Sequence, residues 1–287
     1  MIKSNDTVTV VLTAFKRADM LKKQLEAIKN QSVKPDEILL FQDKIPKDYI
    51  ISIDDSILGS FDGVCIAKEN IGVWGRFDYA RQAQSEYVCI FDDDTIPGNR
   101  WIENCLGQMH INPGIYGTIG IVVGKNNQYP YNGFYRIGWD RPNSKTREVD
   151  FVGHSWFIKK EWLAYMFDGT EKFQKFKYAA EDMCLSFACQ KHGIKSYVPP
   201  HPRNRKDMWG SMPEIAAIAG VNSALSMSSE NNKRMYQAMR LMIKEGWKSL
   251  YIREPGLVGK EIRQAKIVDG IALAKRGFRL IRKQKYN

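Results

Sequence analysis

The stretch YVCIFDDDTIPG, residues 87–98, joins a short apolar run to three consecutive aspartates and a turn. The run from Tyr87 to Phe91 is rich in β-branched and aromatic residues, which predicts a buried strand. Adjacent carboxylates repel one another unless a cation or strong hydrogen-bond donors lie among them, and grouped oxygen ligands suit Mg²⁺ or Mn²⁺. We therefore expect Asp92, Asp93 and Asp94 at the carboxyl end of a strand, where open α/β sheets bind ligands. An acidic turn that caps a helix is the alternative.

The chain before this stretch alternates apolar runs with helical patterns. Strands are predicted at residues 7–13, 37–41 and 64–67, and helices at residues 20–28 and 76–84. Strands that alternate with helices in short units predict a mostly parallel sheet with right-handed crossovers.

The chain after residue 98 has a different pattern. Strands are predicted at residues 115–123, 133–138 and 149–158 without helices between them, which indicates an antiparallel or mixed extension of the sheet. Helices are expected at residues 160–167 and 181–191, a short strand at 195–198, and helical structure from about Pro213 onward. The fold class is α/β, a mixed sheet flanked by helices with a C-terminal helical extension. We divide the chain into a catalytic domain, residues 1–212, and that extension, residues 213–287.

Composition limits the classes of protein. The chain is 44% hydrophobic and 26% charged, which is typical of a globular enzyme rather than a disordered protein. Five scattered cysteines without a CxxC pair favour a reducing compartment, and no signal peptide or membrane span is expected. We expect a cytoplasmic protein.

The net charge of +11 is concentrated at the C-terminus, where residues 260–287 hold nine Lys or Arg and two acidic residues. The remainder is only mildly basic, so we expect no nucleic-acid partner. Ile267, Ile271, Ala274, Phe278 and Ile281 mark one face of a basic amphipathic helix. Such a helix either contacts an anionic membrane surface peripherally or packs on the catalytic domain.

Further acidic groups and one histidine stand at predicted strand ends or helix starts. Asp43 ends the second strand, where a carboxylate can accept hydrogen bonds from a nucleobase or ribose; a turn aspartate is the alternative. Glu181 and Asp182 open a helix, which the macrodipole alone explains, but with the aspartate triplet they suggest a proton-accepting group. His201 lies between prolines just beyond the last strand, as a metal ligand or a surface histidine.

These segments resemble a GT-A glycosyltransferase of the family 2 and exostosin-like groups. The resemblance rests on VTVVLTAFKR, EILLFQD, YVCIFDDDTIP, FVGHSWF, AAEDMCLSF and PPH, and covers residues 7–205. It implies a metal-dependent enzyme that moves a sugar from a nucleoside-diphosphate sugar, of UDP type, to the hydroxyl of a glycan or lipid-linked acceptor. Family 2 implies inversion at the anomeric carbon, whereas the exostosin-like group implies retention.

The resemblance also implies roles for residues. Asp182 is the expected catalytic base, with Glu181 as its neighbour. Asp94 would bind Mn²⁺ or Mg²⁺, and His201 would complete the metal or diphosphate site. The donor and acceptor would be held by Thr13, Ala14, Arg17, Asp43, Arg76, Asp92, Asp93 and His154, with Gly153 and His154 at the acceptor side. Residues 204–212 form either a lid over the donor or a linking loop.

Other functions fit the sequence less well. The QxxRW pattern is absent, and the loop after Asp43 is basic, which argues against a processive synthase. A sugar-nucleotide pyrophosphorylase usually has a glycine-rich loop after its first strand, and residues 13–17 hold no glycine. A non-catalytic nucleotide- or carbohydrate-binding module has no need of a separate Asp182.

Overall fold

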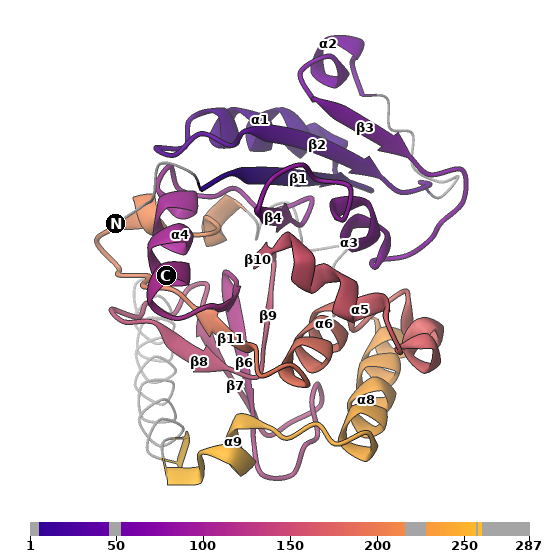
Figure 1. Cartoon of the computed structure of the whole chain (residues 1–287), viewed down its shortest axis with the longest axis vertical. Helices are drawn as coiled ribbons and strands as arrows, with labels where there is room; N and C mark the ends of the chain where they lie inside the picture. The colour runs from indigo at the N-terminus through magenta and orange to yellow at the C-terminus, as the bar shows by residue number, and fades with distance from the viewer. Residues whose placement is uncertain (1–5, 46–52, 216–227, 257, 260–287) are drawn as a thin grey trace, which may run out of the picture.

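The computed structural model describes residues 6–45, 53–215, 228–256, 258 and 259 of the chain. Within these residues the strands form a sheet of eight, in the order β3-β2-β1-β4-β10-β5-β11-β8, and a sheet of three, in the order β7-β6-β9. The first four strands lie at the top of Figure 1, and the three-stranded sheet lies below them. The fold class predicted from the sequence is confirmed: helices flank a large mixed sheet.

The first four strands are parallel, as expected from the alternation of strands and helices. They are β1 (Val8–Ala14), β2 (Glu37–Gln42), β3 (Gly63–Ile66) and β4 (Tyr87–Phe91). The helical segments around them are η1 (Ala18–Met20), α1 (Leu21–Lys29), α2 (Asp55–Leu58), α3 (Gly75–Ala80) and α4 (Trp101–Ile111).

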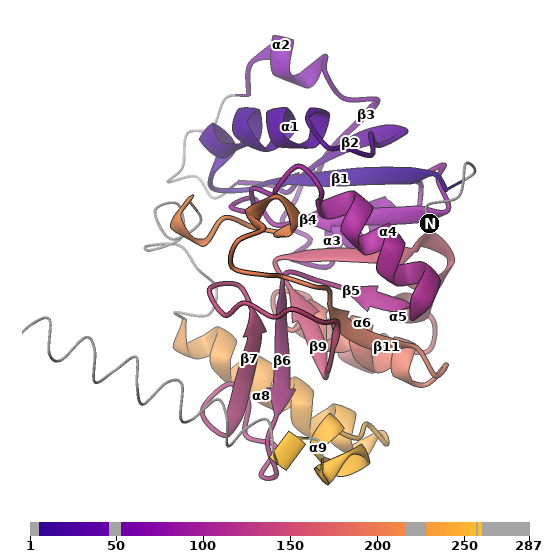
Figure 2. The ribbon, with the colours of Figure 1, turned by 90° about the vertical axis from the view of Figure 1, so that its left-hand side faces the viewer.

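The strand order changes direction beside β1. The chain moves outward from β1 through β2 to β3 and then returns to place β4 on the other side of β1. Right-handed crossovers put α1 and α3 on opposite faces of the sheet. The segment after α1 meets the start of α4, where the Gln31 side chain accepts a hydrogen bond from the backbone N–H of Ile102; Figure 2 shows both helices from the side. The carboxyl ends of β1 and β4 thus form a topological switch point, the usual place for a ligand in such sheets.

The second half of the large sheet is mixed. It comprises β10 (Ser155–Lys159), β5 (Gly114–Tyr116), β11 (Lys195–Val198) and β8 (Arg147–Val149). β10 runs antiparallel to β4, with Ser155 opposite Phe91. This register brings the residue before β10, His154, to the carboxyl end of β4.

Two of the expected strands are wrong. Residues 115–123 belong to β5 and to β6 (Ile119–Val123), which lie in different sheets. The chain crosses between the sheets at Gly117, where a Cβ atom would lie 2.4 Å from the Cβ of Val152. Residues 149–158 are likewise divided among β8, β9 (Phe151–Gly153) and β10.

The three-stranded sheet packs against helices from the second half of the chain. β6 is its central strand, between β7 (Phe134–Gly138) and β9, and Ile121 on β6 is opposite both Arg136 and Phe151. Directly paired residues share a face of a sheet, so these three side chains lie together. The helical segments that follow are η2 (Lys160–Leu163), α5 (Ala164–Phe167), η3 (Glu171–Phe176), α6 (Glu181–Gln190) and η4 (Lys206–Met208).

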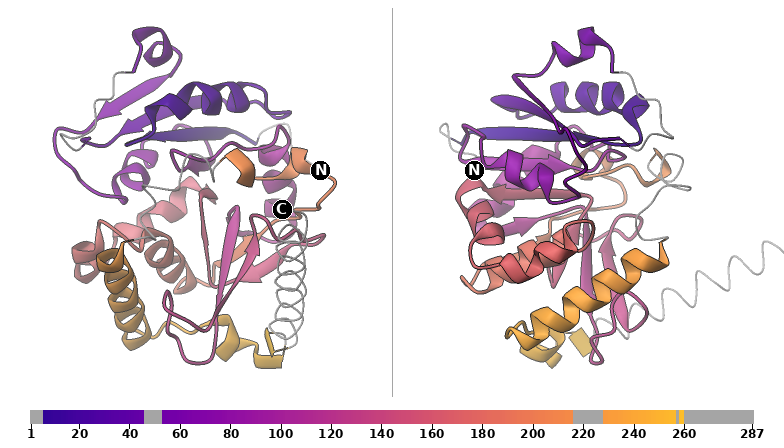
Figure 3. Two further views of the ribbon diagram at one scale, coloured as in Figure 1. Left: turned by 180° about the vertical axis from the view of Figure 1, so that it is seen from behind. Right: turned by 90° about the vertical axis from the view of Figure 1, so that its right-hand side faces the viewer.

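Two further helices, α8 (Ser229–Lys244) and α9 (Leu250–Arg253), close the lower part of the molecule. α8 lies along α6 and η3 (Figure 3). Met235, Met239 and Met242 recur at helical spacing, and they are buried in the same hydrophobic core as the strands. The division at residue 212 stays a prediction, but the side chains of α8 share the core of the catalytic fold.

A buried aspartate connects α9 to both sheets. Asp150, between β8 and β9, accepts hydrogen bonds from the backbone N–H groups of Val123 at 2.6 Å and Leu250 at 2.5 Å. Burial raises the pKa of Asp150 to about 7, although these two hydrogen bonds act in the opposite direction.

The five cysteines are free thiols; Cys65 is half-buried and the other four are buried. Among the described residues, no helix has the length and apolar character needed to cross a membrane. The predicted basic amphipathic helix lies at residues 260–287, outside the described part of the chain.

Candidate functional site

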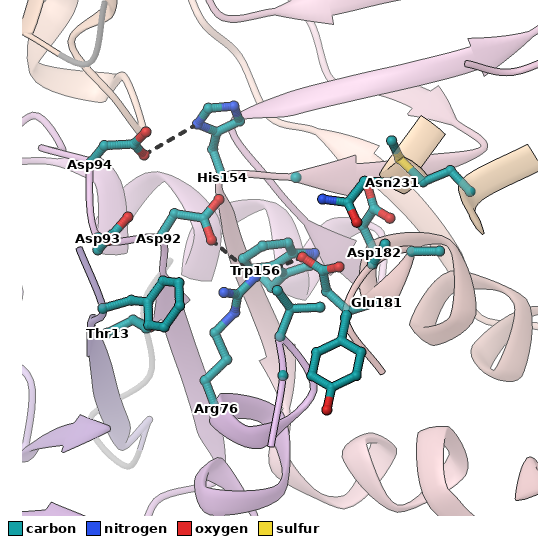
Figure 4. Close-up of a pocket in the computed structure, with 18 of the residues that line it drawn as sticks. Thr13, Arg76, Asp92, Asp93, Asp94, His154, Trp156, Glu181, Asp182 and Asn231 are labelled. Carbon is teal, nitrogen blue, oxygen red and sulfur yellow. Dashed lines mark hydrogen bonds and ion pairs between the residues drawn. The ribbon is translucent and has the colours of Figure 1, made fainter. Parts of the chain in front are cut away.

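A cavity of about 620 Å³ opens at the carboxyl ends of β1 and β4, a size typical of small-molecule sites. Its walls come from both sheets, from α3 and α6, and from the first two turns of α8. Figure 4 shows the acidic residues after β4 on one side of this cavity and Asp182 on the other.

Arg76 stands between the two acidic groups of the cavity wall. Its Nη2 lies 3.0 Å from Asp92 Oδ1 and 2.8 Å from Glu181 Oε1, and its guanidinium packs 4.9 Å from the centroid of the Trp156 ring. The residue is 7% exposed. Arg76 comes from α3, Asp92 from the end of β4 and Glu181 from the start of α6, so one buried cation ties three elements together.

The second arginine of the site neutralises the other two aspartates. Arg17 Nη1 pairs with Asp93 and lies 3.4 Å from Asp94 Oδ2. Burial raises the pKa of Asp93, and Arg17 opposes that rise. Burial raises the pKa of Asp94 too, and the neighbouring Asp92 adds to the effect. A further cation beside Asp94 would offset this cost.

Asp92, Asp94 and His154 can reach a common ligand. One side-chain donor atom from each lies within 4.8 Å of the others, and His154 Nδ1 is 3.9 Å from Asp94 Oδ1 (Figure 4). His154 Nδ1 is buried without a hydrogen-bond partner. Two carboxylates and one imidazole form a donor set that suits Mn²⁺ among the hard divalent ions. In the described part of the chain, this is the group of side chains that best fits a metal.

Asp182 lies on the opposite wall without a cation in direct contact among the described residues. Its Oδ1 accepts a hydrogen bond from the backbone N–H of Met183 at 2.7 Å. Burial raises the pKa of Asp182 well above its ordinary value, and the adjacent Glu181 charge adds to the effect. Arg76 pairs with Glu181 and not with Asp182. A carboxylate with a raised pKa, directed into a cavity, is a suitable proton acceptor.

The end of the cavity near β2 is formed around Asp43. Its two carboxylate oxygens accept hydrogen bonds from the backbone N–H groups of Lys44, Ile71 and Gly72 at 2.8–3.1 Å. These bonds hold the loop at residues 70–72 against β2. Oδ1 accepts two of them, whereas Oδ2 accepts only the one from Gly72 and keeps a second lone pair for a ligand. Thr13 also lines the cavity, but its Oγ1 donates to the carbonyl of Phe91.

Three residues of the wall have left-handed backbone although none is glycine. They are Trp139, His154 and Ala180, with φ of 58°, 66° and 62°. Trp139 packs its ring 4.5 Å from that of His154, and Ala180 precedes Glu181. Left-handed backbone at non-glycine residues is costly and gathers at functional sites.

The cavity brings together eleven of the thirteen residues to which the sequence assigned a role, Gly153 among them. Asp43, Arg76 and Thr13 lie toward the strand ends with Arg17 and the aspartate triplet, and Glu181, Asp182 and His154 complete the set. Ala14 is not among the lining residues, because its side chain is buried in β1. His154 was expected at the acceptor side, and the register of β10 places it in the candidate metal cluster instead.

His201 does not reach the cluster. It is fully buried, its Nε2 lies 2.8 Å from the carbonyl oxygen of Trp139, and its ring stacks on Trp209 at 4.2 Å. Burial lowers the pKa of His201 to about 4, so the ring is neutral. The Nε2–H group of the neutral His201 donates a hydrogen bond to the backbone carbonyl of Trp139, and the Trp139 ring packs on the His154 ring.

Residues 204–212, expected as a lid or a linker, pack beside the loop that follows β4. The backbone N–H of Gly98 donates to Trp209 and that of Arg100 donates to Asp207, each at 2.7 Å. None of these residues lines the cavity.

Residues that the sequence did not single out complete the wall. They include Tyr129, Arg136, Trp139, Asn231, Arg234 and Met235. The last three have i, i+3, i+4 spacing on α8, which is also the spacing of any buried helix face, so the sequence held no specific signal for them.

A model of glycosyl transferase family 2 matches residues 9–167. Among solved structures, the chain resembles the crystal structure of S. aureus TarS, with a TM-score of 0.46 and 14% identity over 67% of this chain and 35% of that chain. No curated protein sequence matches the chain. The family match spans more than half of the chain, from β1 to α5, and the protein therefore belongs to glycosyl transferase family 2 and has a GT-A fold.

Proposed function

We propose that this glycosyltransferase uses a nucleoside-diphosphate sugar as donor and a divalent cation, Mn²⁺ or Mg²⁺, as cofactor. The observation that supports this most is the separation of two acidic groups across one cavity. Asp92 and Asp94 with His154 form a donor set on one side, and Asp182, with its raised pKa, stands on the other.

The cation would be held by Asp92, Asp94 and His154. When bound, it would supply positive charge to the diphosphate that leaves the donor sugar. Arg17 neutralises Asp93, and Arg76 neutralises Asp92 and Glu181. Asp43 and the backbone around Gly72 would bind the nucleoside, at the end of the cavity beside β2.

Asp182 would accept the proton of the acceptor hydroxyl. The hydroxyl oxygen forms a bond to the anomeric carbon while the bond from that carbon to the diphosphate oxygen breaks. The proton goes to Asp182, and the diphosphate leaves with the electron pair. A base on the face opposite the leaving group favours a single displacement with inversion. Burial raises the pKa of Glu181, and the ion pair with Arg76 opposes that rise.

The C-terminal extension would complete the catalytic unit, because α8 supplies Asn231, Arg234 and Met235 to the cavity wall. We further propose a donor of UDP type, a glycan or lipid-linked acceptor, and peripheral membrane contact through residues 260–287. The last two share a rationale, since a lipid-linked acceptor lies at a membrane surface.

The test begins with a thermal-shift screen of nucleoside diphosphates with and without Mn²⁺, because a ligand of the folded state raises the unfolding temperature by mass action. One diphosphate should stand out, and only with the metal. Release of that diphosphate from its sugar conjugates then measures turnover. Asp94→Asn should lose the metal-dependent shift and turnover, whereas Asp78→Asn, an exposed acid on α3, should keep both. Full turnover in excess EDTA would exclude metal dependence.

A further inference from the structure

The cavity has two ends with different charge. The end beside β1, β2 and β4 carries Asp43 and the aspartate triplet. The opposite end is bounded by the three-stranded sheet and by α8, and its charged side chains, beyond Glu181 and Asp182, are Arg136 and Arg234. In the proposed function, this second end receives the acceptor.

Arg136 has no carboxylate within ion-pair distance among the described residues. It lies on β7 opposite Ile121, on the sheet face that lines the cavity, and its side chain is exposed. Its guanidinium carbon is 5.7 Å from the centroid of the Phe134 ring. Tyr129 lines the same part of the cavity, and its ring is held 5.0 Å from the rings of Phe134 and Phe151.

Arg234 lies on α8 and lines the same end of the cavity as Arg136. Its Nη1 donates to the Asn231 side-chain oxygen at 3.2 Å, and its guanidinium lies 5.8 Å from the centroid of the Tyr178 ring. Its Nε is 3.4 Å from Glu230, whose side chain is 61% exposed. An ion pair this exposed is weak, so Arg234 can exchange it for a stronger partner.

The other arginines of the cavity are engaged and cannot serve the acceptor. Arg76 pairs with Asp92 and Glu181, and Arg17 pairs with Asp93 and Asp94. Arg136 and Arg234 are thus cations with weak or no acidic partners at the end of the cavity that contains Asp182. A guanidinium matches the geometry of phosphate and carboxylate oxygens with paired N–H donors.

We propose that the acceptor carries an oxyanion, a phosphate or a carboxylate, close to the hydroxyl that receives the sugar, and that Arg136 and Arg234 bind it. This inference rests on the proposed function, because it assigns the substrate class of the same site. Tyr129, in the cavity wall, would contact the uncharged part of the acceptor, and Asp182 would face its hydroxyl.

The test compares three ligands that differ at one carbon: glucose, glucuronate and glucose 6-phosphate. Calorimetry measures their binding to the full chain saturated with Mn²⁺ and the diphosphate selected by the thermal-shift screen. At least one anionic ligand should bind about tenfold more tightly than glucose, because charge-assisted hydrogen bonds exceed neutral ones. Preference for glucose 6-phosphate or for glucuronate identifies the oxyanion as phosphate or carboxylate.

Arg136→Gln and Arg234→Gln should each reduce this preference, and the double variant should abolish it. Arg141→Gln, after β7, and Lys233→Gln, on α8, remove equal charge outside the cavity lining and should leave the preference unchanged. Equal binding of the three ligands, binding of none, or a preference that survives in the double variant would overturn the inference. Absence of diphosphate binding by the wild type, measured first, would instead refute the proposed function.

Discussion

Replacement of Arg76 by methionine tests whether the cavity is held together by a buried ion-pair network. Methionine keeps an unbranched side chain beside Trp156 and Phe77 but leaves Asp92 and Glu181 without their shared cation. Removal of one partner from a buried ion pair costs about 3–5 kcal/mol, because the remaining charge has no compensation. The Asp92 side chain is 26% exposed, so water can compensate part of that charge. We therefore expect a loss of about 3 kcal/mol in the free energy of unfolding at pH 7.5.

The loss should depend on pH in a definite direction. Burial already raises the pKa of Glu181 in the folded protein, and Arg76 opposes that rise, so Arg76→Met raises this pKa further. A carboxyl group with a raised folded-state pKa is favourable while protonated, and that contribution disappears as the pH rises through the folded-state pKa. The deficit of Arg76→Met relative to wild type should thus be larger at pH 7.5 than at pH 5.

Urea denaturation at the two pH values measures both effects. Arg81→Met on the same helix is the control, because the Arg81–Asp78 pair has side chains that are 43% and 61% exposed, and such pairs contribute about 0–1 kcal/mol. The reasoning is refuted if Arg76→Met loses less than about 1 kcal/mol at pH 7.5, or if its deficit is equal at both pH values.

Three further predictions follow from other groups. Asp182→Asn should lower turnover by roughly a hundredfold or more, the scale of a general base, with donor affinity by calorimetry nearly unchanged; lost donor binding would assign Asp182 to the donor site. The raised pKa of Asp150, about 7, means that its stabilising contribution is present below the unfolded value of 3.8 and is lost as the pH rises to 7. The stability advantage of the wild type over Asp150→Asn in urea should therefore shrink between pH 5 and pH 7.5, and a constant difference would show that Asp150 does not titrate in this range. The full chain should co-sediment with anionic vesicles at low salt, and a chain that ends at Pro255 should not; equal behaviour of both would assign a structural role to the tail.

The parallel half of the sheet could be predicted from sequence because its signals are local. The runs of β1, β2 and β4 are continuous, short and bounded by polar turns, and each acidic group follows its strand directly. The same kind of local pattern gave a wrong prediction at residues 115–123, where it indicated one strand instead of two. This apolar run changes sheet at Gly117, and apolar residues on both sides of the change are buried. No periodicity distinguishes one buried strand from two.

The candidate site could be predicted from sequence as far as its residues stand at strand ends or helix starts. The position of His154 depends on the antiparallel register of β10 against β4, which is set by tertiary packing. His201 carried a plausible pattern, but Trp139 and Trp209 enclose it, and neither contact is local in sequence. The contribution of α8 could not be predicted from its own sequence, because Asn231 and Arg234 reach the cavity only through the packing of α8 on α6.

The left-handed backbone at Trp139, His154 and Ala180 brings stability and activity into competition at these positions. A side chain in that conformation costs about 1–2 kcal/mol, and glycine would avoid the cost. Selection for stability alone would therefore draw His154 and Ala180 toward glycine, whereas the Trp139 side chain also packs against the hydrophobic core. The resulting chains would resist heat better, but they would lack the imidazole of the cavity wall. Heat-resistant variants selected without a test of activity should therefore acquire glycine at His154 or Ala180 and lose activity, while their sheets and helices stay intact.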